Sequence, residues 1–374
     1  MSLSYQSMSN GKIRSRILDK PKVAVVYTTP DKVIDDIARA MDLAEYKTFL
    51  SNDLTTLLKV NVSWQHYYPA CSTTPWQLDG VTKTLRDSNY GRLISTHNGT
   101  VVVDAKTGAI NNKHDVVEKK HNVESVHLES VKWSYYEPKT KMRVLDKVYP
   151  EGIQIPEMFM GTNIIHLPTA KTHVFTTVTG AMKNAFGGLL NHKRHWTHSV
   201  IHETLVDLLH IQKEIHPGIF AVTDGTFAGD GPGPRAMRWH KKNVILASAD
   251  QVAIDAVVAK MMGFDPMSIK FIRLAHESGL GCGNVSQIEC VGDDISRVNW
   301  QFASKENTFA SRIQKLIYWG RLKPLEYVLL RSPLVGLSYL ASNLYHNAYW
   351  IRFVGNRRVA AAMKTDWGEL FQKY

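Results

Sequence analysis

Cysteine is scarce in this chain. Its 374 residues include only Cys71, Cys282 and Cys290, and no two of them stand at C-x-x-C spacing. This scarcity argues against a disulfide scaffold, a zinc ribbon and a self-contained iron–sulfur cluster, because each needs several closely spaced cysteines. It favours a reducing compartment, so we expect a cytoplasmic protein.

Long apolar runs and nucleotide motifs are also missing. No run of 18 or more apolar residues occurs, so a membrane-spanning helix is not expected, and residues 1–20 lack the apolar core of a secretory signal. Neither G-x-G-x-x-G nor a P-loop is present, so the motifs support no nucleotide fold. The positive charge is spread along the chain and no nucleic-acid module is recognisable, so we expect no nucleic-acid partner.

An excess of positive charge is what the chain does have. Lys and Arg number 45 against 34 Asp and Glu, which gives a formal net charge of +11. Such a balance favours anionic partners, and the composition alone does not choose between a small anionic ligand and an acidic membrane surface. At 44% hydrophobic residues, the chain has enough apolar side chains for a sizeable core.

Short apolar runs alternate with amphipathic stretches along most of the chain. Runs typical of buried strands occur at 23–27, 163–167, 218–222 and 243–247. They predict an α/β fold of mostly parallel sheets flanked by helices, with two α/β lobes and a cleft between them. We expect a flexible tail at 1–20, the α/β core at 21–298 and a helical C-terminal extension at 299–374.

The C-terminal extension interleaves aromatic and basic residues. Helical aromatic stripes usually pack against a core, and we favour that interpretation. The alternative is peripheral membrane contact through residues 300–374.

Several local signals predict how individual elements begin. Asp31 is expected to cap the first helix, and Thr74 is expected to cap a helix that has Pro75 at its first position. The stretch 224–234 is so rich in Gly and Pro that an irregular loop is predicted. Asp255 lies within an apolar helix, where a buried carboxyl group needs a hydrogen-bond partner. We expect it to form a structural hydrogen bond to a strand edge.

The segment from Lys171 to His198 is the strongest candidate for an active site. A predicted strand ends at Pro168, so Lys171 and His173 should leave the carboxyl end of a strand, where α/β folds place ligands. Gly180 permits close backbone approach, and the helix starting after it would favour an anion. Lys183 would clamp a phosphate or, if desolvated, act as a nucleophile or base. In the plain alternative, Lys183 is solvated and His173 is a turn residue.

Histidines cluster at the end of this segment. His195 and His198 are candidate metal ligands, and His198 and His202 would share one helical face. Alternatively, these histidines are structural or exposed. His97, after another strand, is a further polar group for the same cleft. Asp224 and Asp230 could bind a metal or a ribose hydroxyl, or could simply form a tight turn.

Several of these motifs occur in the order found in a known family. Leu167 to His173, Thr179 to Gly187, Asp224-Gly225 and Ala247 to Asp255 closely resemble the domain of unknown function 362 family over residues 20–295. That family is sometimes joined to ferredoxin-type iron–sulfur modules. The cysteine-rich module is absent from this chain, which weakens an electron-transfer role.

A second, weaker resemblance is to nickel-dependent lactate racemase. The order His173, Lys183-Asn184, His198 is similar to the pattern of its catalytic subunit. This resemblance implies that Lys183 anchors a nickel–pyridinium nucleotide, that His198 ligates the metal and that His173 moves a proton. His97 would match a further histidine of that site.

Together these patterns favour an enzyme of isomerase or oxidoreductase type. It would move a proton or hydride on a small carboxylate-bearing substrate, assisted by a cofactor that the sequence does not identify, with nickel or iron as the candidates. Catalysis is assigned to His173, Lys183 and His97. Ligand binding is assigned to Lys171, Thr179, Gly180, Asn184, Asp224 and Asp230. The alternatives are a redox partner of an iron–sulfur system and a membrane-surface binding protein. Assembly into a homo-oligomer stays open.

Overall fold

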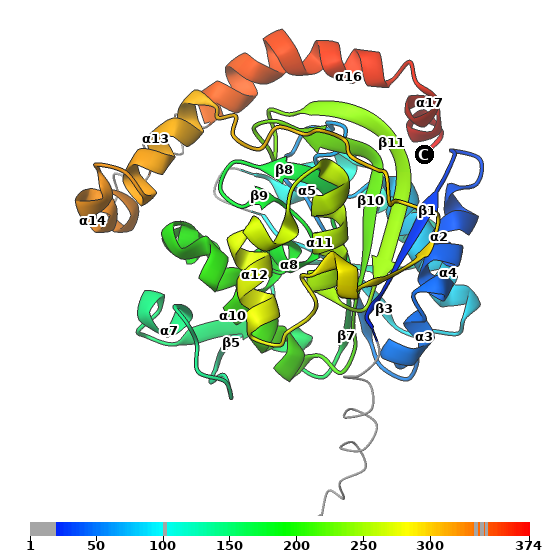
Figure 1. Ribbon diagram of the computed structural model, residues 1–374, viewed down its shortest axis with the longest axis horizontal. Helices are drawn as coiled ribbons and strands as arrows, with labels where there is room; N and C mark the ends of the chain where they lie inside the picture. Colours follow the sequence, from blue (N-terminus) through cyan, green and yellow to red (C-terminus); the bar gives the residue numbers. More distant parts are fainter. Residues whose placement is uncertain (1–19, 100–102, 333–335, 337–339, 341–342) are drawn as a thin grey trace, which may run out of the picture.

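One mixed sheet forms the centre of the protein (Figure 1). The computed structural model describes residues 20–99, 103–332, 336, 340 and 343–374, so the predicted tail lies almost wholly outside the described residues. The strand order is β12-β1-β11-β10-β7-β2-β3-β4, with β8 paired to β10 and β9 paired to β8. The strands are β1 (Lys22–Tyr27), β2 (Thr56–Val60), β3 (Leu93–His97), β4 (Glu124–His127), β7 (Asn163–Leu167), β8 (Thr169–His173), β9 (Thr177–Val178), β10 (Ile219–Asp230), β11 (Arg238–Ser248) and β12 (Glu289–Gly292).

Most neighbouring strands in this sheet run parallel. The exceptions are β11, which is antiparallel to both β1 and β10, and the short β9. A separate antiparallel pair joins β5 (Trp133–Tyr136) to β6 (Ile153–Pro156). The predicted α/β class with mostly parallel strands is confirmed. The main sheet is continuous, and the expected division into two lobes with a cleft between them stays a prediction.

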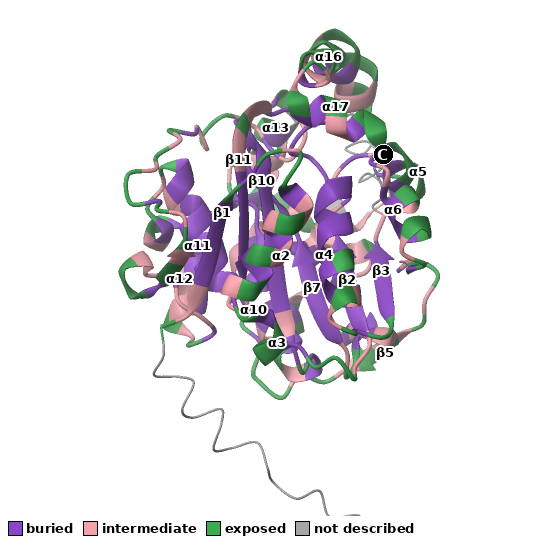
Figure 2. Cartoon of the chain, turned by 90° about the vertical axis from the view of Figure 1, so that its right-hand side faces the viewer, coloured by how far each residue is buried: buried purple, intermediate pink, exposed green. Residues whose placement is uncertain are grey.

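Helices cover both faces of the sheet, and the strands between them are buried (Figure 2). Their packing divides the apolar core into two clusters, one on each side. The α-helices of the core are α2 (Val33–Leu43), α3 (Tyr46–Phe49), α4 (Pro75–Asp87), α5 (Ala105–Asn111), α6 (His114–Lys120), α7 (Leu145–Val148), α8 (Ala181–Asn184), α9 (Phe186–Leu189), α10 (Ile201–Ile215), α11 (Gln251–Met262) and α12 (Lys270–Glu277). The 3₁₀ segments are η1 (Glu157–Phe159), η2 (His192–Val200), η3 (Pro266–Ser268) and η4 (Val285–Gln287).

The predicted helix starts were partly right. The Thr74 side chain accepts a hydrogen bond from the Gln77 N–H at 3.3 Å, and Pro75 opens α4 as expected. The prediction for Asp31 was wrong. Lys32 stands at the N-cap of α2. The acidic residues Asp35 and Asp36 in the first turn provide the negative charge that favours a helix start.

The prediction of an irregular loop at 224–234 was right for residues 231–234, which form bends and turns, and wrong for residues 224–230. β10 continues to Asp230 and pairs with β11 through a register shift between Gly225 and Phe227. Glycines are tolerated here because they allow other groups to approach the strand closely. A Cβ on Gly229 would lie 2.5 Å from the Met237 sulfur.

The C-terminal extension runs as an arc of helices along one side of the core (Figure 1). It contains α13 (Phe309–Tyr318), η5 (Lys323–Leu325), α14 (Glu326–Arg331), the π-helical η6 (Leu344–Gly355), α16 (Asn356–Ala362) and α17 (Asp366–Lys373). Trp367 of α17 is fully buried, with its ring 5.1 Å from that of Trp76. The end of the extension therefore packs on the core, as favoured. Within the described residues, no helix combines the length and apolar character needed to cross a membrane.

Candidate functional site

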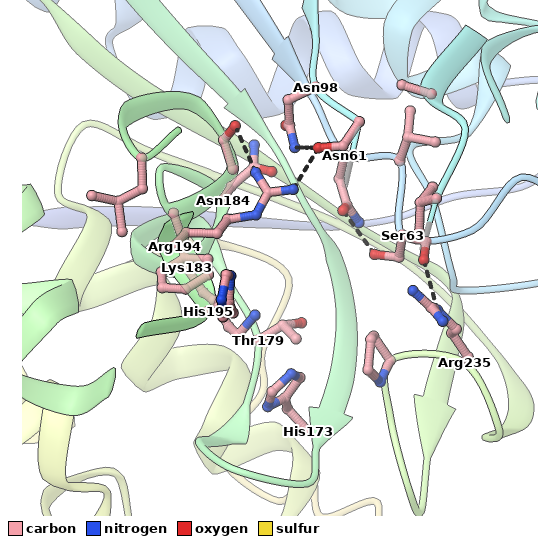
Figure 3. Close-up of a pocket in the computed structure, with 18 of the residues that line it drawn as sticks. Asn61, Ser63, Asn98, His173, Thr179, Lys183, Asn184, Arg194, His195 and Arg235 are labelled. Atoms are coloured by element: carbon pink, nitrogen blue, oxygen red, sulfur yellow. Dashed lines mark hydrogen bonds between the residues drawn. The ribbon is translucent and has the colours of Figure 1, made fainter. Parts of the chain in front are cut away.

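A cavity of about 1020 Å³ lies at the carboxyl ends of β2 and β3, beside β8 (Figure 3). Its walls come from the ends of these strands, from α8 and η2, and from α13 of the C-terminal extension. Carboxyl ends of parallel strands are where α/β folds bind ligands, because the loops there leave a crevice. The cavity contains most of the segment that the sequence singled out.

Positive side chains dominate the lining of this cavity. Among the described residues that line it, the acids are Asp104 and Glu129, and the basic residues are Lys59, Lys106, Lys171, Lys183, Arg194 and Arg235. Asp104 is already engaged, since it caps the start of α5 through the N–H groups of Lys106 and Thr107. The cavity is therefore strongly electropositive.

Lys59 is a buried lysine among these lining residues. It belongs to β2, and its Nζ donates to the Val60 carbonyl at 2.6 Å and to Asn98 Oδ1 at 2.7 Å. Burial, reinforced by the nearby Arg194, lowers the pKa of Lys59 to about 7. Both of its bonds are to neutral acceptors, which compensate a buried charge incompletely.

Lys183 stands on α8, and Asp255 fixes the start of that helix. The Asp255 carboxylate accepts hydrogen bonds from the N–H groups of Ala181 at 2.7 Å and Met182 at 3.1 Å. The predicted anion site at this helix start was therefore wrong, because a side chain of the protein already occupies it. We expected Asp255 to bond to a strand edge, but its partners are the N–H groups at the start of α8. Burial, together with Lys171 and Arg194, lowers the pKa of Lys183 to about 7.

Lys171 and His173 lie on a strand of their own. The sequence predicted that they follow the end of a strand, whereas the structure places them within β8, after a break at Pro168. The Lys171 ammonium donates to the Thr169 hydroxyl, and burial lowers the pKa of Lys171 to about 8. Thr179 hydrogen-bonds to the Lys171 carbonyl through its backbone N–H at 2.9 Å.

His173 has a defined tautomer. Its Nδ1 accepts hydrogen bonds from the N–H groups of Phe175 at 3.2 Å and Thr176 at 3.4 Å. In the neutral ring the proton is therefore on Nε2. Burial and the neighbouring Lys183 hold the pKa of His173 well below its usual value, so the ring is neutral and offers an N–H donor.

His198 has the opposite arrangement. Its Nδ1 lies 3.1 Å from the His195 carbonyl and donates to it, which leaves Nε2 as an acceptor. Burial lowers the pKa of His198 to about 3, so this ring is also neutral. It stacks on Tyr318 of α13, with ring centroids 5.6 Å apart and planes 11° apart.

The histidine cluster differs from the predicted metal site. His195 and His198 lie on η2 and His202 lies on α10, so the expected shared face of one continuous α-helix was wrong. Among the residues that the structure describes, no three His, Cys, Asp or Glu side chains are grouped so that they could hold a metal ion. The donors present do not fit a metal held by protein side chains alone.

Two arginines flank the cavity from opposite sides (Figure 3). Arg194 donates to the Gly99 carbonyl, and the Arg235 Nε donates to the Ser63 carbonyl at 3.0 Å. Asn184 lies near Arg194 and donates to the Lys59 carbonyl at 2.8 Å. These bonds orient the side chains and leave both guanidinium groups charged.

Three predicted site residues lie outside the cavity lining. Asp224 accepts hydrogen bonds from Trp76 Nε1 at 3.0 Å and from the Thr226 N–H at 2.6 Å. Asp230 forms an ion pair with Arg238 at 2.9 Å. His97 is fully buried against Glu118, with 2.5 Å between its Nε2 and the carboxylate.

Sequence reasoning missed several lining residues. Lys59 could have been found, because a lone lysine in the apolar strand Leu57–Val60 must face something polar. Arg194 stands within the histidine cluster that was singled out. Arg235 and the α13 residues carry no local signal, since only the tertiary fold brings them to the cavity.

The chain is thus an α/β protein with a cavity lined mainly by basic side chains at the carboxyl edge of its sheet. The chain belongs to the family described as Domain of unknown function (DUF362), whose model matches residues 56–260, a shorter span than the predicted 20–295. This match supports the first of the two resemblances, and the resemblance to lactate racemase stays a prediction.

One relative is a protein of Synechocystis sp. named Thylakoid-associated protein sll1697. It is 29% identical to this chain over 124 residues, which is 31% of this chain and 37% of the relative. The matched stretch thus spans little more than a third of the relative's length. No solved structure matches the chain.

Proposed function

We propose that this protein is an enzyme that binds a small molecule carrying carboxylate or phosphate groups and moves a proton on it. One observation carries the proposal: of the cavity-lining residues that the structure describes, six are Lys or Arg and two are acids. Cations gathered around a cavity without matching acids favour a ligand that supplies the negative charge.

Burial explains why an anion would bind well here. Lys59 and Lys171 are almost completely buried, and the pKa of each is lowered because the charged form lacks full compensation. A bound anion would restore the charged form of both lysines. The guanidinium of Arg194 adds a planar donor group suited to carboxylate or phosphate oxygens.

Lys183 is the best-placed group for proton transfer. With its pKa lowered to about 7, it can both accept and release a proton at neutral pH. His173 would offer its Nε2–H to the developing charge on the substrate, and Nε2 of His198 would accept a hydrogen bond. In this assignment Lys183 is the base and the two neutral histidines orient the substrate.

A thermal-shift titration tests the binding step. Sulfate, inorganic phosphate, pyrophosphate and citrate are compared with chloride at equal ionic strength. We expect the multivalent anions to raise Tm in the wild type and to have a much smaller effect in Arg194→Met and Lys183→Met. Lys305→Met changes an exposed lysine outside the cavity and should behave as the wild type does. Equal shifts in all four proteins would overturn the proposal.

Amine acylation tests the chemical step. Because the pKa of Lys183 is about 7, its reaction with an amine-reactive acylating reagent should reach half of its maximal rate near that pH, far below an ordinary lysine. Peptide mapping by mass spectrometry locates the modified residue. If Lys183 reacts only at the high pH at which exposed lysines react, the proposal that it acts as a base is refuted.

We further propose that the protein works in the cytoplasm at a membrane surface. The name of the Synechocystis relative supports this location, since that protein is described as thylakoid-associated. The net charge of +11 suits contact with acidic lipids.

A further inference from the structure

Helix α13 turns its polar side inward and its apolar side outward. Thr308, which caps it, and Ser311, Gln314 and Tyr318 line the cavity. On the outer side, Phe309 is 71% exposed, and Ile313 and Leu316 follow at helical spacing with 40% and 47% exposure. An ordinary surface helix has the reverse arrangement, because apolar side chains are normally buried. The exposed apolar side of α13 therefore indicates a surface that binds another molecule.

The apolar surface continues beyond α13 into η5 and α14. Leu325, Tyr327 and Val328 are 52%, 69% and 55% exposed. We call Phe309, Ile313, Leu316, Leu325, Tyr327 and Val328 the outer face. These residues lie at one end of the arc of C-terminal helices (Figure 1).

Positive charge accompanies the outer face. Arg312, Arg321 and Lys323 are exposed, and residues 307–325 contain no Asp or Glu. Basic residues that flank exposed aromatic and aliphatic side chains are typical of segments lying in a membrane interface, where the charged groups reach the lipid headgroups.

A second aromatic row lies farther along the arc. Tyr349 and Phe353 of η6 are 55% and 59% exposed, with ring centroids 5.4 Å apart. The exposed Arg352 and Arg357 flank this row. The same combination of apolar rings and positive charge thus recurs on the C-terminal helices.

We propose that the outer face docks on an acidic lipid bilayer. This inference rests on the membrane location proposed above and is independent of the chemistry of the cavity. Acidic lipid satisfies both properties of the face, since the headgroups attract Arg312 and Arg321 while the acyl boundary accepts the apolar side chains. A second copy of this chain is disfavoured, because two chains of formal charge +11 repel one another.

Docking in this way has a consequence for the cavity. Ser311 and Gln314 line the cavity from the opposite side of α13, so the docked helix separates the headgroup layer from the ligand by one helix thickness. The α13 wall of the cavity would then rest against the membrane surface.

Vesicle flotation tests the outer face. The full chain is floated with vesicles of phosphatidylglycerol mixed with phosphatidylcholine, and separately with phosphatidylcholine alone. We expect binding to the acidic vesicles only. The triple variant Phe309→Ser, Leu325→Ser, Val328→Ser should lose more than about tenfold in partition coefficient. Arg312→Gln with Arg321→Gln should lose about fivefold per charge removed.

The matched control removes apolar side chains elsewhere on the surface. Ile110→Ser, Tyr135→Ser and Met160→Ser change residues that are 53%, 67% and 49% exposed, and this triple variant should float as the wild type does. Circular dichroism checks that all variants are folded.

Each other outcome overturns part of the proposal. A wild type that does not float refutes both the membrane location and the docking. A wild type that floats while both triple variants float equally well refutes the outer face and leaves the location standing. Concentration-dependent dimerisation that the first triple variant abolishes would assign the face to a second copy of the chain. The cavity proposal survives all three results, because anion titrations test it separately.

Discussion

A carboxyl oxygen of Asp255 accepts a hydrogen bond from the Ala181 N–H at 2.7 Å and thereby fixes the turn that carries Lys183. Asp255 is buried in the apolar helix α11, and burial raises its pKa to about 8. Asp255, which is 74 positions beyond Ala181 in the chain, therefore positions the proposed base Lys183 without lining the cavity.

Replacing Asp255 with Asn tests the titration of this carboxyl group. A folded-state pKa raised above the unfolded value means that the protonated group stabilises the fold at low pH and that this contribution is lost as pH rises. The unfolding free energy of the wild type, relative to Asp255→Asn, should fall between about pH 4 and about pH 8. Urea denaturation of both proteins across this range measures the difference, and a constant difference would contradict the assignment.

Gly180→Ala tests how closely the chain approaches Asp255. A Cβ at position 180 would lie 2.0 Å from Asp255 Oδ1, so the carboxylate would have to leave its two N–H donors. We expect a loss of about 1–3 kcal/mol in unfolding free energy. Gly91→Ala is the matched control, because no atom lies within 4 Å of its added Cβ, and its unfolding midpoint should stay close to that of the wild type.

Lys183→Met should stabilise the protein while weakening anion binding. The folded-state pKa of Lys183 is below its unfolded value of 10.5, so the lysine destabilises the fold at and below neutral pH, and this penalty fades as pH rises toward 10.5. The gain at neutral pH should be about 1 kcal/mol, allowing for solvent screening of a partly exposed group. Denaturation of both proteins at neutral and alkaline pH measures this gain in unfolding free energy, which should be present at neutral pH and vanish near pH 10.5.

Trp367→Ala tests whether the extension belongs to the core. Trp367 is fully buried against Trp76, and its Nε1 donates to Asn243 Oδ1 at 2.8 Å. Removing the indole should lower the unfolding free energy by about 3–5 kcal/mol. Phe353→Ala, an exposed aromatic of the same extension, should cost less than about 1 kcal/mol. Similar losses from both changes would mean that the extension is not anchored as described.

Periodicity and capping chemistry predicted much of the fold. The apolar runs predicted β1, β7, the start of β10 and the second half of β11, and Thr74 with Pro75 marked the start of α4. The glycines at positions 225 and 229 misled the prediction, because pairing with β11 holds residues 224–230 in a strand despite their turn composition. Tertiary pairing overrode local propensity there.

The location of the site could be predicted from the sequence, but not its full set of residues. Lys171, His173, Lys183 and His198 stand close together in the chain, and the structure brings them to one cavity. Asp224 and Asp230 follow a predicted strand, yet their carboxylates bind neighbouring groups of the protein instead. Only long-range packing decides which polar groups are satisfied internally and which face the cavity.

The most direct test of the anion site is the pH dependence of pyrophosphate affinity, measured by isothermal titration calorimetry. Lys59, Lys171 and Lys183 have pKa values lowered to about 7 or 8, so they lose charge just above neutral pH. The account predicts binding near pH 6 that weakens by at least about tenfold near pH 9, with a smaller change in Lys183→Met. No binding at either pH, or an affinity equal at both and unaffected by Lys183→Met, would contradict it.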